Sequence, residues 1–356
     1  MPGIRRVRRG RGFAYRSSQG HWLADADEIR RIQHLAIPPA YSDVWICPLP
    51  NGHLQATGRD ARGRKQYRYH PDWMAAQGSA KFERLLAFGR ALPRIRARVA
   101  RDLRRGIRLC AGSNPQLSQS LVLATLVRLL DTTLVRIGND EYARGNGSFG
   151  LTTLRNPHAK VRGQSLRLSF RGKSGVMHDI TVQDPRLARI VRRCQELPGQ
   201  ELFQYQDADG EVRRIGSGEV NHYISEAAGS MTGERFTAKD FRTWHGSALA
   251  LELACKSDDS EGCFAIKPAL AEVSGRLRNT PAVCRSSYIH PKVLELWQGL
   301  ASATPDEAAQ IRADTHICGN VHSLSRGRMP LAEQRLLGFL LASERGRSRR
   351  AVRPAA

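Results

Sequence analysis

The sequence lacks the features that mark several common classes of protein. No apolar run approaches the roughly 18 residues of a membrane-spanning helix, and the basic stretch at residues 4–12 has no apolar segment of the signal-peptide kind. Seven cysteines are scattered without Cys-x-x-Cys spacing, which indicates neither a disulfide framework nor a zinc ribbon. No His-Glu-x-x-His motif is present, and Asp207 and Asp209 do not complete a calcium loop. We therefore expect a protein of a reducing cytoplasm that uses neither a metal nor a membrane.

Two glycine-rich strings resemble nucleotide-binding motifs but do not fit them. The string GNGSFG at 145–150 matches Gly-x-Gly-x-x-Gly, yet it follows a helical stretch, whereas a dinucleotide fingerprint follows a strand and opens a helix. The string GKS at 172–174 resembles the end of a P-loop, but the position of the first required glycine is Arg167. No nucleotide cofactor is expected.

Acidic residues are too few to balance the basic ones. The 56 Lys and Arg against 33 Asp and Glu give a net charge of +23 and a pI near 10.7. Such a surplus indicates a polyanionic partner, with nucleic acid as the leading candidate, because a cationic surface gains affinity by releasing phosphate counterions. A basic protein without a polyanionic partner stays open as the alternative. The Arg-rich ends, 5–11 and 345–353, are interpreted as mobile arms that add DNA affinity or as plain solvated tails.

The length of 356 residues favours two domains, and the hydrophobic period changes near residue 80. Short β-branched and aromatic runs make residues 30–73 β-rich, with turns at 51–52 and 60–63. We expect an α+β protein with a β-rich N-terminal domain, a mainly helical domain and a basic tail, at residues 1–80, 81–340 and 341–356.

The larger domain is expected to contain two long helices before a β hairpin. The helices cover 81–105, with an interruption at Pro93, and 115–137, which delivers Arg136 at its end. The alternating strands 165–170 and 176–182 form the hairpin, and its tip exposes Lys173. Beyond Asp184 the pattern is helical to near residue 341, with a turn at 207–210 and with Pro281 and Pro291 in first helical turns.

Tyr288 is the candidate nucleophile among clustered cations. A phenol has a pKa near 10 and needs positive neighbours to attack at neutral pH. Arg136 and Arg242 suit the oxygens of a phosphodiester, because a guanidinium binds phosphate bidentately and keeps its proton. Lys173 suits the acid that protonates a leaving oxygen, and Asn279 can donate to a phosphate oxygen or cap a helix. Singly, each basic residue would usually be a solvated one and Tyr288 a core residue.

The motifs around these residues resemble those of type IB DNA topoisomerases of the small bacterial and poxvirus kind. The matching strings are IPPAYSDVWI (37–46), GRKQYRY (63–69), VRIGN (135–139), Tyr142 with Asn146 and GLTTL (150–154), FRGKSG (170–175), FTAKDFRTW (236–244) and NTPAVCRSSY (279–288).

The resemblance implies roles for individual residues. Tyr288 would become linked to a DNA 3′ phosphate while the free 5′ hydroxyl end swivels and religates. Arg136, Lys173 and Arg242 take the family's arginine, lysine and arginine roles, and Lys239 matches a further basic residue that assists cleavage. Asn279 stands where the poxvirus enzymes have His and bacterial relatives have Asn. A glycine is usual in place of Arg278, which is therefore the clearest departure.

The resemblance also implies how DNA is held. Gln66, Tyr67 and Tyr69 align with residues that touch DNA, and Lys65 lies beside them on the same predicted strand; a core position for each tyrosine stays open. A clamp around duplex DNA, hinged near residue 80, is expected to work as a monomer in a bacterial nucleoid, without ATP or metal.

Two other functions stay open. A tyrosine recombinase shares the catalytic domain and the tyrosyl chemistry, but it usually has His where Lys239 stands and lacks a module like residues 37–73. A non-catalytic DNA-binding protein would keep the fold without the chemistry.

Overall fold

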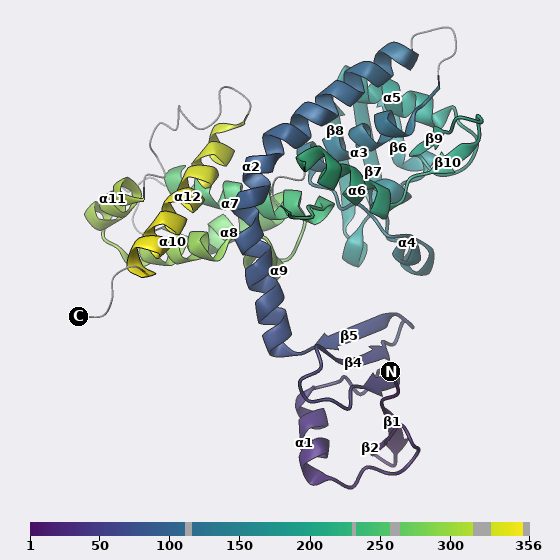
Figure 1. Cartoon of the computed structure of the whole chain (residues 1–356), viewed down its shortest axis with the longest axis vertical. Coiled ribbons are helices and arrows are strands. Elements are labelled where there is room, and N and C mark those ends of the chain that lie inside the picture. Colours follow the sequence, from purple (N-terminus) through teal and green to yellow (C-terminus); the bar gives the residue numbers. More distant parts are fainter. Residues whose placement is uncertain (111–115, 230–232, 257–263, 316–328, 352–356) are drawn as a thin grey trace. The chain divides into compact units, whose positions relative to one another are not determined.

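The computed structural model describes residues 1–110, 116–229, 233–256, 264–315 and 329–351 (Figure 1). The chain divides into two compact units, Met1–Lys81 and Phe82–Ala356. The division falls inside helix α2 (Pro71–Cys110), which begins ten residues earlier than the sequence pattern indicated. Pro71 suits the first turn of a helix, because its missing N–H would have no partner there, and Asp72 favours the positive end of the helix dipole.

The first unit is a small antiparallel sheet covered by one helix. Strand order is β2-β1-β3-β4-β5, and the apolar side chains of Ile4, Val44 and Ile46 are buried against Ile32 of the helix. The elements are β1 (Ile4–Arg9), β2 (Gly12–Arg16), α1 (Ala26–His34), β3 (Ser42–Ile46), β4 (Leu54–Arg59) and β5 (Lys65–Tyr69). The last three strands agree with the prediction from sequence. Helix α1, whose start is capped by the Asp25 carboxylate, was not predicted.

The basic N-terminal stretch is a strand, so its interpretation as a mobile arm is wrong. β1 pairs with both β2 and β3, and Ile4 is buried. Arg6 donates to the carbonyls of Ile37 at 3.1 Å and Tyr41 at 2.6 Å. Successive side chains of a strand point to opposite faces, and only one face needs to be apolar, so a strand can contain several arginines. The high charge of this segment therefore does not reveal that it pairs with other strands.

Helix α2 continues through Pro93, which the sequence analysis expected to interrupt it. Proline in a helix interior removes one hydrogen bond and costs roughly 3 kcal/mol. Leu92 and Ile95 on either side are fully buried, and burying such side chains stabilises a structure by about 1.5–3 kcal/mol each. Tertiary packing therefore offsets the local preference.

The second unit is mainly helical and contains a three-stranded antiparallel sheet, β6-β7-β8. The predicted hairpin is confirmed: β7 (Ser165–Arg171) pairs with β8 (Met177–Gln183), and β6 (Ala159–Arg162) adds a strand. Helix α3 (Gln119–Thr133) ends four residues earlier than expected, because Leu134 takes a left-handed conformation. Arg136 therefore lies in the loop after the helix.

The later part of this unit is helical except for one short hairpin. β9 (Gln204–Gln206) and β10 (Val212–Arg214) were missed, although the turn that joins them at 207–210 was predicted. The helices are α4 (Asp140–Asn146), α5 (Pro185–Gln195), α6 (Ser217–Ala228), α7 (Ala238–Lys256), α8 (Ile266–Leu277), α9 (Pro281–Ser287), α10 (Pro291–Ser302), α11 (Pro305–Asp314) and α12 (Leu331–Ala351).

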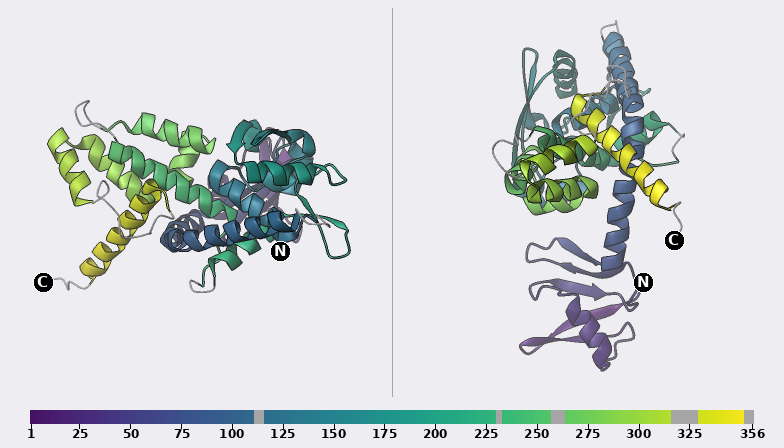
Figure 2. Two further views of the ribbon diagram at one scale, coloured as in Figure 1. Left: turned by 90° about the horizontal axis from the view of Figure 1, so that it is seen from above. Right: turned by 90° about the vertical axis from the view of Figure 1, so that its left-hand side faces the viewer.

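Helix α7 occupies the centre of the helical part. It packs against α8, α10 and α12 (Figure 2), and its Phe241 and Trp244 are fully buried. Pro281 and Pro291 occupy first turns, as predicted. The GNGSFG string spans the end of α4 and the loop after it, which is not the strand-to-helix setting of a dinucleotide site.

The segment from residue 341, which was predicted as a basic tail, continues as helix within the described residues. α12 extends to Ala351, in keeping with the helix preference of its Arg, Glu and Ala residues. Residues 352–356 of the predicted tail and the side chain of Tyr142 lie outside the described residues.

Candidate active site around Tyr288

Helix α9 brings Tyr288 to its C-terminal end. Thr280 Oγ1 accepts from the Val283 amide at 3.4 Å, and the Tyr288 amide donates to the Cys284 carbonyl at 2.9 Å. The cap of this helix is therefore Thr280, and the alternative that Asn279 caps it is wrong. The Asn279 side chain is left for other contacts.

Helix α7 holds the backbone of Tyr288. Ser247 Oγ donates to the Tyr288 carbonyl at 3.2 Å and accepts from the His290 amide at 2.9 Å. A Cβ atom added at Gly246 would lie 2.8 Å from the same carbonyl oxygen, so glycine permits this approach. The tyrosine side chain is 8% exposed, and the position of its ring follows α7.

Arg242 lies over the Tyr288 ring, one turn before Gly246. Its Cζ atom is 4.9 Å from the ring centroid, and its side chain is 3% exposed. Nη2 donates to the Leu277 carbonyl at 2.7 Å, and Nη1 donates to the carbonyl of Leu134. Those carbonyls come from the ends of α8 and α3, so the guanidinium joins three helices beside the phenol and keeps further N–H groups.

The electrostatics of this cluster favour a phenolate. Burial acts to raise the pKa of Tyr288, but the charge of Arg242, its hydrogen bonding to the phenol and the charges of Arg136 and Lys239 outweigh burial. The pKa of Tyr288 is therefore lowered from its ordinary value of about 10. Burial, followed by the charge of Arg136, lowers the pKa of Arg242, and a guanidinium still stays charged at neutral pH.

Arg136 is held by two backbone segments that meet at glycines. The Leu151 amide donates to the Arg136 carbonyl at 2.9 Å, and a Cβ on Gly150 would lie 2.5 Å from Gly138 Cα. Gly138 has a φ of 106°, which only glycine adopts easily. The GLTTL string is thus the support of the loop that carries Arg136.

Asn279 joins Arg136 to the tyrosine side of the cluster. Arg136 Nη2 donates to Asn279 Oδ1, which fixes the orientation of the amide. Its Nδ2 is buried and has no oxygen or nitrogen acceptor among the described residues, and Cys284 lies beside it. Buried donors are nearly always hydrogen-bonded in folded proteins, so the Nδ2 group of Asn279 could donate to an acceptor atom of a bound ligand.

Lys173 stands apart from this cluster, on the turn of the β7–β8 hairpin. The turn Lys173–Gly175 has Ser174 in a left-handed conformation, and Lys173 is exposed. Within the described residues its ammonium makes no hydrogen bond or ion pair with the other candidates. Lys239 is also exposed, at the start of α7, and reaches Tyr288 through its charge.

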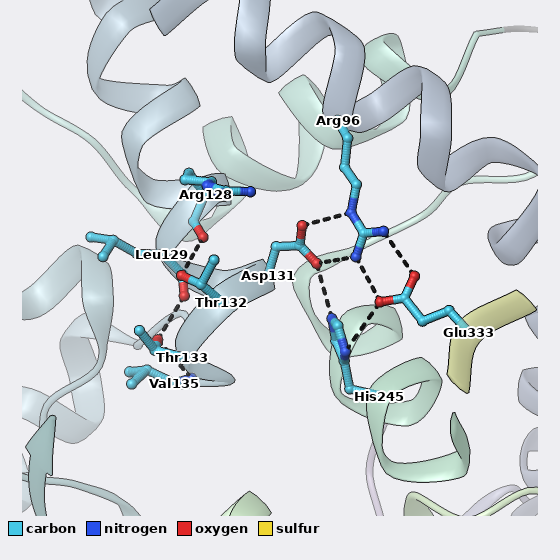
Figure 3. A network of polar contacts seen from close by, with 9 residues as sticks. All are labelled: Arg96, Arg128, Leu129, Asp131, Thr132, Thr133, Val135, His245 and Glu333. Atoms are coloured by element: carbon cyan, nitrogen blue, oxygen red, sulfur yellow. Dashed lines mark hydrogen bonds and ion pairs between the residues drawn. The ribbon is translucent and has the colours of Figure 1, made fainter. Parts of the chain in front are cut away.

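A buried polar network supports the helices of the site (Figure 3). Arg96 of α2 donates from Nε and Nη2 to Asp131 of α3, both at 2.8 Å, and from Nη1 to Glu333 of α12 at 2.8 Å. His245 of α7 contacts Asp131 at 2.9 Å and lies three residues after Arg242. These four residues were not predicted, because their spacing along the chain gives no signal that they meet.

In the first unit, the predicted DNA-contacting residues lie on edge strand β5. Tyr67 and Tyr69 are 47% and 38% exposed, so the core alternative is wrong for both. Their rings stack at 6.2 Å, Tyr69 stacks on Trp73 at 4.7 Å, and Lys65 Nζ is 5.7 Å from the Tyr67 ring. Gln66 faces elsewhere and donates to Asp60 in the β4–β5 turn at 3.0 Å. Trp73, which was not predicted, is partly buried and extends the row of stacked rings beyond the two exposed tyrosines.

In the described part of the chain, no three His, Cys, Asp or Glu side chains are grouped where they would hold a metal ion. None of the helices in the described ranges is both long and apolar enough to cross a membrane.

Comparison with known proteins assigns both units. Residues 12–60 match the bacterial DNA topoisomerase IB N-terminal domain, and residues 70–314 match the eukaryotic DNA topoisomerase I catalytic core. The chain is 31% identical over 309 residues to DNA topoisomerase 1B of Acanthamoeba polyphaga mimivirus, across 84% of this chain and 88% of the relative. It is 25% identical over 157 residues to DNA topoisomerase 1B of Vaccinia virus (strain Copenhagen), across 42% and 46% of the two chains. Because the catalytic-core match alone spans more than half of the sequence, this chain belongs to the DNA topoisomerase IB family.

Proposed function

We propose that this chain relaxes supercoiled duplex DNA by transient cleavage of one strand, with Tyr288 as the nucleophile. The observation that carries the proposal is the contact between the Tyr288 phenol and the buried Arg242 guanidinium, with Arg136 and Lys239 near enough to lower the phenol pKa. A phenol so placed has little structural use for three cations. It has a clear use for them as a nucleophile toward a phosphodiester.

The reaction exchanges one phosphate ester for another. The phenolate oxygen attacks a DNA phosphorus, the phosphorus–O5′ bond breaks, and a 3′-phosphotyrosine and a free 5′ hydroxyl result. The phenol proton leaves to solvent, and the ammonium of Lys173 supplies a proton to the departing O5′. Because the new ester preserves the energy of the broken bond, the 5′ hydroxyl can reverse the step after the strand has swivelled, without a nucleotide or a metal.

The remaining residues of the cluster stabilise the charge that grows on the phosphate. Arg136 and Arg242 donate to the non-bridging oxygens, and the buried Nδ2 of Asn279 donates to the same group. Arg136 already bonds the Asn279 amide, so the two donors are organised before DNA arrives. Preorganised donors stabilise a transition state because they do not have to reorient when charge develops.

Duplex DNA is the proposed partner of the β5 surface as well. Lys65, Tyr67 and Tyr69 give it one cation and two exposed phenols, which suit phosphate and groove contacts. Gln66 is engaged by Asp60, so its DNA contact requires release from that hydrogen bond. Because only one strand is cut at a time, a monomer is sufficient for this reaction. We place it in the cytoplasm of a bacterial cell, at the nucleoid.

The test is covalent trapping during plasmid relaxation. Wild-type protein should relax supercoiled plasmid in EDTA without ATP, and denaturant should leave DNA attached to the peptide that contains Tyr288. Tyr288→Phe should bind DNA with unchanged affinity and give neither relaxation nor adduct. Tyr205→Phe, which removes a phenol hydroxyl that accepts from Gln119 Nε2 at 3.4 Å, should retain both. Relaxation by pure Tyr288→Phe protein refutes the nucleophile assignment.

The two alternatives predict other results in the same experiment. A tyrosine recombinase would exchange strands between two duplex sites, and the matched N-terminal topoisomerase module argues against it. A non-catalytic DNA-binding protein would shift plasmid in a gel without nicking it. The lowered pKa of Tyr288 argues against that alternative.

A further inference from the structure

Arg278 occupies a backbone position that disfavours arginine. It ends helix α8 in a left-handed conformation, with φ 50° and ψ 57°. A residue with a side chain is disfavoured in this conformation relative to the right-handed form, whereas glycine adopts it easily. The next residue is Asn279, whose backbone N–H donates to the Ser274 carbonyl at 3.0 Å and closes the same corner. A favourable contact of the arginine side chain can offset this backbone cost.

The side chain reaches the hairpin that carries Lys173. Arg278 Nη2 donates to the main-chain carbonyl of Asp179 on β8 at 2.8 Å. In the β7–β8 register, Asp179 pairs with Ser169, two pairs before the end of the hairpin at Arg171 and Met177. One guanidinium thus joins the corner that positions Asn279 to the strand that leads to the Lys173 turn.

The hairpin end is stiff enough to transmit such a contact. His178, next to Asp179, is 3% exposed and stacks on Phe170 at 4.8 Å. Its ring lies beneath the turn, because a Cβ on Gly172 would be 2.6 Å from His178 Nε2. The Gly172 amide donates to the Val176 carbonyl at 2.8 Å and closes the turn. These contacts restrict the chain between Asp179 and Lys173, so a shift of β8 at Asp179 should also move Lys173.

We propose that Arg278 is a positioning residue that holds the Lys173 hairpin in register with the Asn279 corner. The inference rests on the proposed role of Lys173 as the proton donor. Asn279 belongs to the Arg136 side of the cluster, whereas Lys173 has no direct bond to that side within the described residues. The hydrogen bond from Arg278 to the main-chain carbonyl of Asp179 connects the Asn279 corner to the Lys173 hairpin. It leaves the groups that would bind the phosphate free to do so.

The experiment compares two DNA substrates in single-turnover cleavage by the full-length chain. One has an ordinary 5′ oxygen at the scissile phosphate, and the other has a bridging 5′ sulfur, whose thiolate leaves without a proton. Arg278→Gly should slow cleavage of the ordinary substrate by about 10-fold, since small misplacements of a catalytic group cost up to about 100-fold. On the sulfur substrate Arg278→Gly and wild type should cleave at nearly equal rates. Arg276→Ala, which removes an exposed arginine of the same helix, should match wild type on both.

Each other outcome identifies a different error. Equal slowing of Arg278→Gly on both substrates refutes the inference and places Arg278 at the phosphate or at Asn279 itself. If Arg278→Gly cleaves the ordinary substrate at the wild-type rate, the inference is also refuted. Because glycine suits the left-handed corner, the variant should fold, and a melting temperature no lower than that of wild type verifies this.

Failure of the underlying proposal has its own signature. If Lys173→Ala is not rescued by the sulfur substrate, Lys173 is not the acid, and the inference falls with that role while Tyr288 still forms its adduct. If wild-type protein forms no adduct at all, the proposed reaction is wrong. When both assignments hold, the Lys173→Ala and Arg278→Gly double variant should be no slower than Lys173→Ala alone, since the two changes act on one step.

Discussion

Asp131 is the residue whose loss should damage the second unit most clearly. Asp131 is 7% exposed, and its carboxylate accepts two hydrogen bonds from Arg96 at 2.8 Å and contacts His245 at 2.9 Å (Figure 3). Burial alone acts to raise the pKa of this carboxyl, but the hydrogen bonds from Arg96 and His245 and their charges hold the pKa well below its usual range. The substitution Asp131→Asn keeps the shape and removes the charge.

The expected loss follows from the geometry of the network. Removing one partner of a buried ion pair typically costs about 3–5 kcal/mol. Glu333 remains to neutralise Arg96 at 2.8 Å, and an asparagine oxygen can still accept one hydrogen bond, so the lower end, about 3 kcal/mol, applies. For a unit of this size each kcal/mol moves the melting temperature by roughly 2–4 °C, which predicts a decrease of about 6–12 °C.

Scanning calorimetry of the full chain tests this magnitude. The transition of the second unit should shift and that of the first unit should not. Glu295→Gln is the matched control: it removes a charge from a half-exposed pair with Lys292 at 2.6 Å, for which less than about 1 kcal/mol is expected. The Asp131 carboxyl has a lowered folded pKa, so its contribution is complete above the unfolded value near 4 and is lost as pH falls through the folded pKa. A shift as small as that of the control, or one that grows toward acid pH, refutes the reasoning.

Two further predictions concern the chemistry and the DNA surface. Single-turnover cleavage should rise with pH with an inflection below pH 10, because the pKa of Tyr288 is lowered. Lys239→Ala should move the inflection upward, and an unmoved inflection excludes an effect of this lysine on the phenol. In anisotropy titrations over a range of KCl concentrations, Lys65→Ala should reduce the salt slope of DNA binding by about 1, whereas Tyr67→Phe should weaken binding by about 1 kcal/mol with an unchanged slope. An unchanged slope for Lys65→Ala would remove it from the interface.

Local signals in the sequence predicted the elements that local chemistry determines. The glycines of FRGKSG and the alternation on either side place the β7–β8 hairpin, and Pro281 and Pro291 mark the starts of α9 and α10, because proline suits a first helical turn. Errors occurred where tertiary packing decides. Pro93 stays helical because its neighbours are buried, and β1 is ordered because two strands pair with it.

The candidate site shows the same division between local and distant information. Tyr288, Arg136, Arg242 and Asn279 were named from residue chemistry and motif, and the structure brings these four together. Their supports were not predictable, because Ser247, Gly246 and the Arg96–Asp131–His245–Glu333 network act through contacts between residues far apart in sequence. Lys173 was predicted on a turn and lies there, but its link through Arg278 required coordinates.

Helix α7 links the cluster around Tyr288 to the packing that stabilises the second unit. Within two turns it presents Arg242 and Ser247 to the Tyr288 corner and His245 to the buried network. Arg242 is itself bonded to the ends of α3 and α8, so the position of its charge over the phenol is determined by the packing of three helices. A rotation of α7 that weakened the network would move Arg242 away from the ring and raise the pKa of Tyr288. The pKa of Tyr288, the proposed nucleophile, therefore depends on the packing of α7 as well as on the residues that contact its ring.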